Sequence, residues 1–110
     1  MMEFDHIAQV VPDIAGAVNW YKDTLPNVEV LYQDDSWGFI SVNGAKIAFV
    51  LRDEHPGHIA WRVSAAELET LAAQFHKEIS DHRDKTRSFY LEAPGGTHLE
   101  IITFEGSDWK

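Results

Sequence analysis

The tripeptide His-Ile-Ala occurs twice in this chain, and its two copies lie 52 residues apart. The copies begin at His6 and His58, and at the same spacing Gly44 corresponds to Gly96. A fixed internal period indicates a repeated structural unit, and it restricts the architecture more than any single residue does. It also places two histidines at equivalent points of two half-domains. The repeat therefore makes this pair a candidate for one metal site.

Length and composition predict a single soluble domain that spans residues 1–110. A chain of 110 residues with 45% hydrophobic residues can bury one core but not two independent ones. It contains no cysteine, which excludes disulfides and thiolate metal sites. A net charge of −9 repels phosphate backbones, so we expect no nucleic-acid partner. We also expect no membrane partner and a cytoplasmic location, because no apolar run approaches the roughly 20 residues of a membrane span and no basic-apolar leader opens the chain.

Each half of the chain follows the same order of strands and helices. Alternating apolar residues predict strands, and a 3.6-residue spacing predicts helices. In the first half, Asp13 is placed to cap a helix and Asn43-Gly44 is a typical hairpin turn. In the second half, Ser64 and Glu67 form a capping box. The expected strands are 3–11, 28–32, 37–42 and 46–51 in the first half and 58–63, 88–91 and 97–104 in the second, with a weakly patterned strand within 80–87.

These elements define two βαβββ modules, residues 3–51 and 58–104, of an α+β fold. A module of this size leaves one face and the edges of its sheet uncovered. We therefore expect the two modules to form a cupped mixed sheet with the helices on the outside. The concave side of such a cup is the natural place for a small-molecule site.

Glu100 is the third candidate metal ligand. It interrupts the apolar run Leu99–Ile102 of the last strand, where a charge is costly unless it is paired or bound to a metal. Two imidazoles and one carboxylate suit Fe2+, with Mn2+, Zn2+, Ni2+ or Co2+ also accommodated, and they leave positions open for a substrate. At the spacing of the repeat Glu100 corresponds to Ala48, so we expect no fourth ligand. The alternatives are that Glu100 faces solvent or pairs with Arg62, and that the histidines are structural.

Three segments of the sequence resemble the vicinal oxygen chelate superfamily, which includes glyoxalase I, bleomycin-resistance proteins, fosfomycin-resistance proteins and extradiol dioxygenases. The segments are FDHIAQVVPDIAGAVNWYKDTL, GHIAWRVSAAELETLAAQF and SFYLEAPGGTHLEII. The resemblance implies a glyoxalase-like fold with metal ligands at His6, His58 and Glu100. It further implies a small-molecule substrate that chelates the metal, and a homodimer whose subunits build the cup together.

The last of these segments is most similar to the extradiol pattern. His82, the pair Phe89-Tyr90, Pro94 and Glu100 follow one another at nearly the spacing of that pattern. The resemblance implies catalytic roles for Tyr90, whose hydroxyl would contact substrate and oxygen, and for His82, which would line the pocket. From the residues alone, Tyr90 is equally an ordinary strand aromatic, and His82 is a solvated loop histidine.

The predicted function is therefore that of a divalent-metal-dependent enzyme of the glyoxalase/bleomycin resistance/dioxygenase type. We place extradiol-like oxygenation ahead of the other chemistries of the family. The alternatives are a non-enzymatic protein that binds a drug-like small molecule, and a glyoxalase-like lyase or thiol transferase. Glyoxalase I-like members carry an acidic ligand on the strand that here holds Ala48, which argues against hemithioacetal isomerisation.

Overall fold

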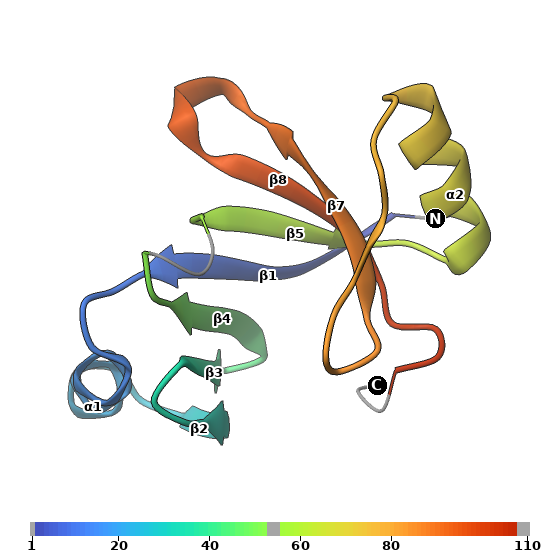
Figure 1. The fold of residues 1–110 in the computed structure, drawn as a ribbon. Coiled ribbons are helices and arrows are strands. Elements are labelled where there is room, and N and C mark those ends of the chain that lie inside the picture. Colours follow the sequence, from blue (N-terminus) through green and yellow to red (C-terminus); the bar gives the residue numbers. More distant parts are fainter. Residues whose placement is uncertain (1, 53–55, 108–110) are drawn as a thin grey trace. The chain divides into compact units, whose positions relative to one another are not determined.

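The computed structural model describes residues 2–52 and 56–107. These residues form a mixed β-sheet arrangement of eight strands with two α-helices, which confirms the predicted α+β class. The elements in chain order (Figure 1) are β1 (Glu3–Val10), α1 (Ile14–Thr24), β2 (Val28–Gln33), β3 (Trp37–Val42), β4 (Ala45–Val50), β5 (His58–Arg62), α2 (Ala65–Gln74), β6 (Ser80–Asp81), β7 (Arg87–Glu92), the 3-10 turn η1 (Pro94–Gly96) and β8 (His98–Thr103).

The chain divides into two compact units. The N-terminal unit is formed by His6–His58, and the C-terminal unit is formed by Met1–Asp5 together with Ile59–Lys110. Strand β1 therefore begins in the C-terminal unit and continues into the N-terminal unit, while β5 begins with the last residue of the N-terminal unit.

The N-terminal unit is a four-stranded sheet with α1 on one face (Figure 1). Its strand order is β2-β3-β4-β1, with β1 parallel to β4 and the other neighbours antiparallel. The predicted cap is present, because the Asp13 carboxylate accepts a hydrogen bond of 2.7 Å from the main-chain N–H of Gly16. The predicted Asn43-Gly44 turn is also confirmed, since both residues have positive φ, as a tight two-residue hairpin requires.

The core of the N-terminal unit lies between α1 and the sheet. Ile14 and Val18 from the helix pack against Ile40 and Phe49 from the strands, and all four are buried. The close approach of helix and sheet needs a glycine at position 38, where an added Cβ would lie 3.0 Å from the Cγ2 of Ile14. Because side chains alternate along a strand, Phe39, next to Ile40, points to the face of the sheet opposite to α1, and the ring of His6 on β1 contacts it there.

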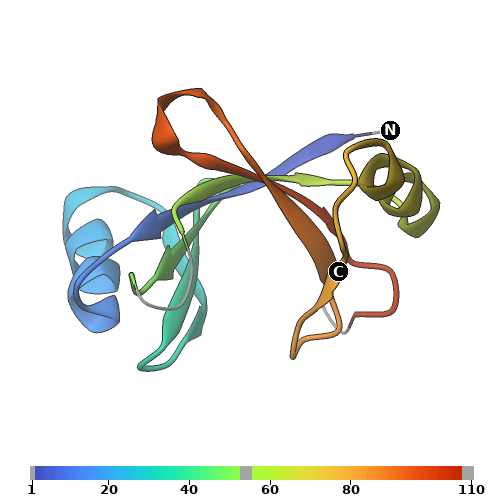
Figure 2. The same ribbon diagram turned by 45° about the horizontal axis from the view of Figure 1, so that its top comes forward.

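The C-terminal unit repeats this construction with α2. The helix begins at the predicted capping box, in which Ser64 Oγ accepts from the N–H of Glu67 at 3.1 Å and Glu67 Oε1 accepts from the N–H of Ser64 at 2.9 Å. Strands β6, β7 and β8 are antiparallel neighbours, and Figure 2 shows the β7–β8 pair in orange and red. The buried core between α2 and this sheet consists of Val63, Leu68, Ala72, Phe89 and Ile101.

Two main-chain hydrogen bonds have the same period as the sequence repeat. The N–H of Val11 donates to the carbonyl oxygen of Val50 at 2.9 Å, and the N–H of Val63 donates to that of Ile102 at 2.9 Å. The donor and the acceptor of the second bond lie 52 residues after those of the first, and 52 residues is also the spacing of the His-Ile-Ala copies. The strand within 80–87 is short, Ser80–Asp81, because a turn occupies the following polar residues.

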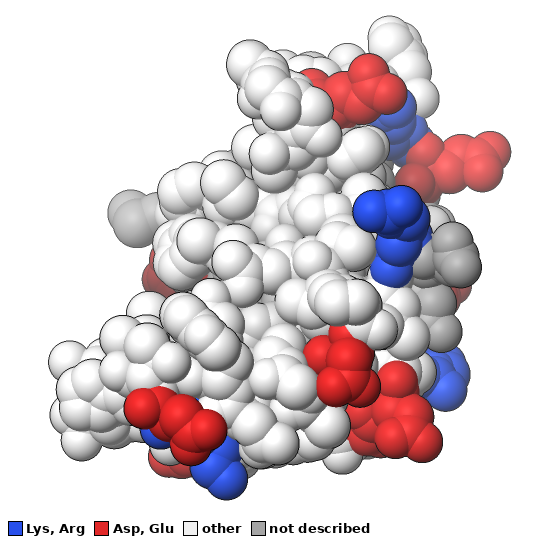
Figure 3. All heavy atoms as spheres, turned by 90° about the vertical axis from the view of Figure 1, so that its left-hand side faces the viewer, with Lys and Arg blue, Asp and Glu red and all other residues white. Residues whose placement is uncertain are grey.

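Charged side chains of both signs lie on the surface. Acidic and basic side chains both appear on the face drawn in Figure 3, so neither sign covers that face alone. Within the described residues, no helix has the length and apolar character that crossing a bilayer would require.

Candidate metal centre

His58 is oriented by a main-chain carbonyl. It is the first residue of β5 and is 5% exposed, and its Nδ1 lies 2.8 Å from the carbonyl oxygen of Pro56. A carbonyl oxygen can only accept, so the hydrogen of the neutral ring is on Nδ1 and the lone pair is on Nε2. Metal-binding histidines are typically fixed in this way, with one ring nitrogen donating to a carbonyl and the other left for the metal.

His6 faces His58 from β1. The centroids of the two rings are 5.5 Å apart and their planes are inclined by 72°. His6 is buried, and its ring also meets the ring of Phe39 edge to face at 5.8 Å. The structure thus brings together the two histidines that the repeat predicted as partners, and both lie in the N-terminal unit.

Glu100 lies in the middle of β8 and is only 3% exposed. Its Oε2 accepts a hydrogen bond of 2.8 Å from Ser88 Oγ. Tyr90 is its direct partner on the antiparallel strand β7. The solvent-facing alternative for Glu100 is therefore wrong. A buried carboxylate that is held by hydrogen bonds is suited to bind a cation.

The second alternative was an ion pair between Glu100 and Arg62. In the structure Arg62 instead pairs with a different carboxylate. Arg62 Nη2 lies 3.0 Å from Oδ1 of Asp5, whose side chain is buried. The guanidinium also stacks over the ring of Phe104 at 3.9 Å. Arg62 thus neutralises the buried carboxylate of Asp5.

Tyr90 has a strongly perturbed hydroxyl. Burial, the negative charge of Glu100 and a hydrogen bond with that carboxylate raise the pKa of Tyr90 far above its usual range. The phenol therefore keeps its proton at every pH at which the protein would act. It is chemically a hydrogen-bond and proton donor beside Glu100.

His82 lies close to Glu100 and is linked to it through Ser88. Its Nε2 is 2.7 Å from Ser88 Oγ and 3.9 Å from Glu100 Oε2. Its side chain is one quarter exposed, so it connects the buried carboxylate with the solvent. The interpretation of His82 as a solvated loop histidine is therefore wrong.

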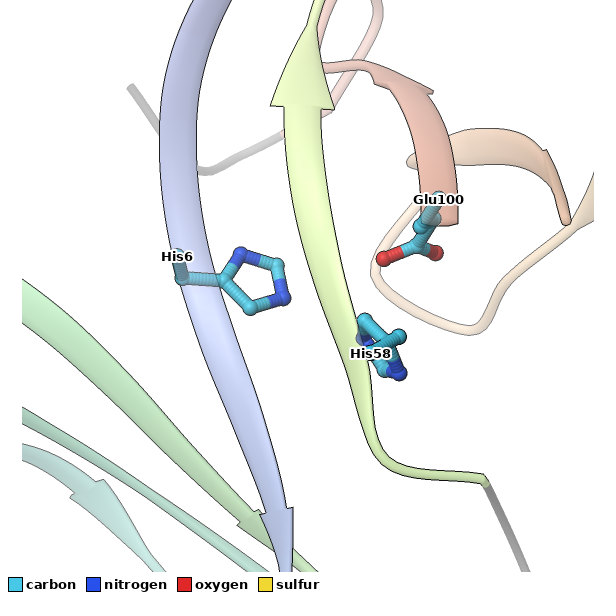
Figure 4. A group of neighbouring side chains, drawn as sticks. All are labelled: His6, His58 and Glu100. Atoms are coloured by element: carbon cyan, nitrogen blue, oxygen red, sulfur yellow. The ribbon is translucent and has the colours of Figure 1, made fainter. Parts of the chain in front are cut away.

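The predicted site residues thus fall into two groups. His6 and His58 face each other in the N-terminal unit, and Figure 4 shows both rings with Glu100, which projects from β8. Glu100, Tyr90 and His82 gather in the C-terminal unit. Ser88 is the residue of this group to which the sequence reasoning gave no role. The sequence feature that could have identified Ser88 is its two-residue spacing from Tyr90, which places both side chains on the same face of β7.

Comparisons with known proteins bear on the fold. No protein-family model and no curated protein matches the chain. Among solved structures, a hypothetical protein from Bacillus halodurans has a TM-score of 0.70 at 18% identity, covering 93% of this chain and 94% of its own. A glyoxalase/bleomycin resistance protein/dioxygenase superfamily member from Vibrio splendidus has a TM-score of 0.65 at 14% identity, covering 94% and 98%.

A third similar structure is a mutant of homoprotocatechuate 2,3-dioxygenase from Brevibacterium fuscum. It has a TM-score of 0.67 at 17% identity over 92% of this chain, which spans only 32% of that longer chain. The chain thus shares its fold with these structures, which confirms the glyoxalase-like fold that the sequence predicted.

Proposed function

We propose that this chain is a divalent-metal-dependent enzyme of the glyoxalase/bleomycin resistance/dioxygenase type, and that His6, His58 and Glu100 hold one metal ion. The observation that carries the proposal is the ring of His58. Its side chain is buried, its Nδ1 lies 2.8 Å from the Pro56 carbonyl oxygen, and the ring of His6 faces it. A main-chain carbonyl that orients the ring through one nitrogen is typical of metal-binding histidines, and the neighbouring imidazole of His6 supplies a second ligand.

The chemistry of the donor set fits a transition metal. The three side chains are a buried set of two imidazoles and one carboxylate that could hold a metal ion. Such a set favours Fe2+ and also accommodates Mn2+, Zn2+, Ni2+ or Co2+. Ala48, which corresponds to Glu100 in the repeat, offers no further ligand.

The internal repeat supports the participation of both units. In the N-terminal unit β1 lies parallel to β4, with Ala8 opposite Ala48. The same pairing in the second module would place Ala60 opposite Glu100. His58 is two residues before Ala60 on the same strand, so its side chain would share the face of Glu100.

Bound in this position, the metal would act as a Lewis acid or redox centre for a substrate that chelates it through vicinal oxygens. The Tyr90 hydroxyl stays protonated because its pKa is raised, and it would redirect its one O–H hydrogen from Glu100 to a substrate oxygen. His82 would exchange protons between the solvent and the site. The burial of Glu100 and Ser88 would keep water away from the carboxylate. Extradiol-like oxygenation of a small catechol-type substrate is the reaction that we favour.

The proposal is tested by loading the protein anaerobically with Fe2+ and adding oxygen and a panel of catechols. A yellow ring-fission product is expected with the wild type. Tyr90→Phe should retain the metal and lose most of the turnover, whereas Glu100→Ala should lose both. Stoichiometric metal without ring fission would leave lyase or transferase chemistry at the same centre. A protein that takes up no metal but binds aromatic ligands would instead be the non-enzymatic binding protein.

We also propose that the chain forms a homodimer. Several large apolar side chains stay exposed in the single chain, among them Ile7 on β1, Ile59 on β5 and Trp20 on α1. A second copy of the chain that covered such side chains would remove their apolar surface from water. Sedimentation equilibrium should give the mass of two chains, and a monomer at all concentrations would contradict this proposal.

A further inference from the structure

Ser88 is the most buried polar side chain next to the proposed metal ligands. It lies on β7 with no exposed surface, and its Oγ is 2.8 Å from Glu100 Oε2 and 2.7 Å from His82 Nε2. A hydroxyl group has one hydrogen to donate and lone pairs to accept with. One buried hydroxyl therefore joins a carboxylate and an imidazole in a continuous chain of hydrogen bonds.

The direction of this chain follows from the charge of Glu100. A carboxylate that binds a metal is ionised and can only accept hydrogen bonds. The Ser88 hydroxyl must then donate to Glu100, and its oxygen lone pair faces His82. Consequently His82 Nε2 carries a hydrogen and donates to Ser88.

We propose that Ser88 is a positioning residue, which holds the Glu100 carboxylate in the orientation required for metal binding and is itself held by His82. This inference rests on the proposed metal site. A glutamate has three rotatable side-chain bonds, so an ion must otherwise immobilise it at an entropic cost. The hydrogen bond from Ser88 restricts the carboxylate before the ion binds, so less conformational entropy is lost on binding.

The loop that carries His82 is itself fixed. The main-chain N–H of His82 donates to the carbonyl oxygen of Thr86 at 2.9 Å, and the Thr86 hydroxyl and N–H donate to Asp84 Oδ1 at 2.6 and 3.0 Å. The Asp84 carbonyl oxygen in turn accepts a hydrogen bond of 2.6 Å from Ser107 Oγ. The imidazole therefore approaches Ser88 from a hydrogen-bonded turn.

The test is a Co2+ titration of the apoprotein followed by visible absorption, whose bands report both affinity and ligand geometry. Ser88→Ala removes the hydroxyl and should weaken Co2+ binding by about 10- to 100-fold and change the absorption bands. Ser88→Thr keeps the hydroxyl and should restore most of the affinity. Thr103→Val is the matched control, since it also removes a fully buried hydroxyl from this unit, one that accepts from the N–H of Glu105, and it should leave Co2+ affinity unchanged.

Circular dichroism and thermal melts in chelator verify that each variant folds. Where Ser88→Ala does not fold, Ser88→Cys carries the test, because the thiol fills the same place as a weaker donor and should give an intermediate loss. Equal Co2+ affinity of wild type and Ser88→Ala, or a folded Ser88→Thr as weak as Ser88→Ala, would overturn this inference alone. A wild type that takes up no Co2+ would overturn it together with the proposed function.

Discussion

Replacing Glu100 by glutamine should separate metal binding from folding. Glu100 is 3% exposed and accepts a hydrogen bond from Ser88, and a glutamine keeps an acceptor oxygen of the same reach. The substitution also removes a buried charge and adds one amide group that needs a partner. These effects oppose each other, so we expect the free energy of unfolding in chelator to change by no more than about 1–2 kcal/mol.

The metal-dependent part of the stability should be lost completely. A ligand that binds only the folded state at 100 times its Kd adds about 2.7 kcal/mol. In a domain of this size about 1 kcal/mol shifts the Tm by roughly 4–8 °C, so saturating metal should raise the Tm of the wild type by roughly 10–20 °C. Glu100→Gln should show almost no such rise.

The assay is differential scanning fluorimetry of both proteins across a metal titration, with a parallel series in chelator. Asp81→Asn is a suitable control, because it removes an exposed carboxylate of the same unit that pairs with Arg87. It should keep the full metal-dependent rise. The reasoning is refuted if Glu100→Gln gains as much as the wild type from the metal.

Three further predictions concern stability. Asp5→Ala leaves Arg62 without its buried partner and should lower the free energy of unfolding by about 1–3 kcal/mol, as measured in urea; a loss below the error of that measurement would contradict the role of the pair. Gly38→Ala should lower the free energy of unfolding by about 1–3 kcal/mol in the same urea measurement, because the new methyl group would meet Ile14. An unchanged urea midpoint would contradict this, since it would show that the helix and the sheet move apart without cost. Hydrogen bonds from the Tyr32 hydroxyl, the Ser36 side chain and main-chain N–H groups lower the pKa of Asp34. A carboxylate whose pKa is lower in the folded than in the unfolded state stabilises the fold above the unfolded pKa of about 4. This stability is lost as the pH falls below that value. The stability advantage of the wild type over Asp34→Asn should therefore shrink below about pH 4, and an advantage that grows on acidification would contradict this sign.

The fold could be predicted from the sequence because the caps and turns that define the repeated elements are local. The Asp13 cap, the Ser64–Glu67 capping box and the Asn43-Gly44 turn depend on residues close to one another in the chain, and each was confirmed. Several strand ends were wrong by one residue, since the last residues of a strand depend on neighbours that the local pattern does not contain.

The site was predicted less completely, because its contacts join distant segments. The partner of Arg62 proved to be Asp5, which lies 57 residues earlier in the chain. The link between Ser88 and Glu100 depends on the register of β7 and β8, which places Tyr90 opposite the glutamate. That register is set by the Pro-Gly-Gly turn and by packing on the helix, and the sequence predicted the turn without its pairing.

The central claim is that His6, His58 and Glu100 share one ion. Anomalous diffraction from crystals loaded with Fe2+ or Co2+ tests it most directly. The account predicts a single peak per site, bonded to His58 Nε2, to a ring nitrogen of His6 and to a carboxylate oxygen of Glu100 at about 2.0–2.2 Å, bond lengths typical of divalent transition metals. A peak bonded elsewhere, or no peak in the loaded crystals, would contradict it.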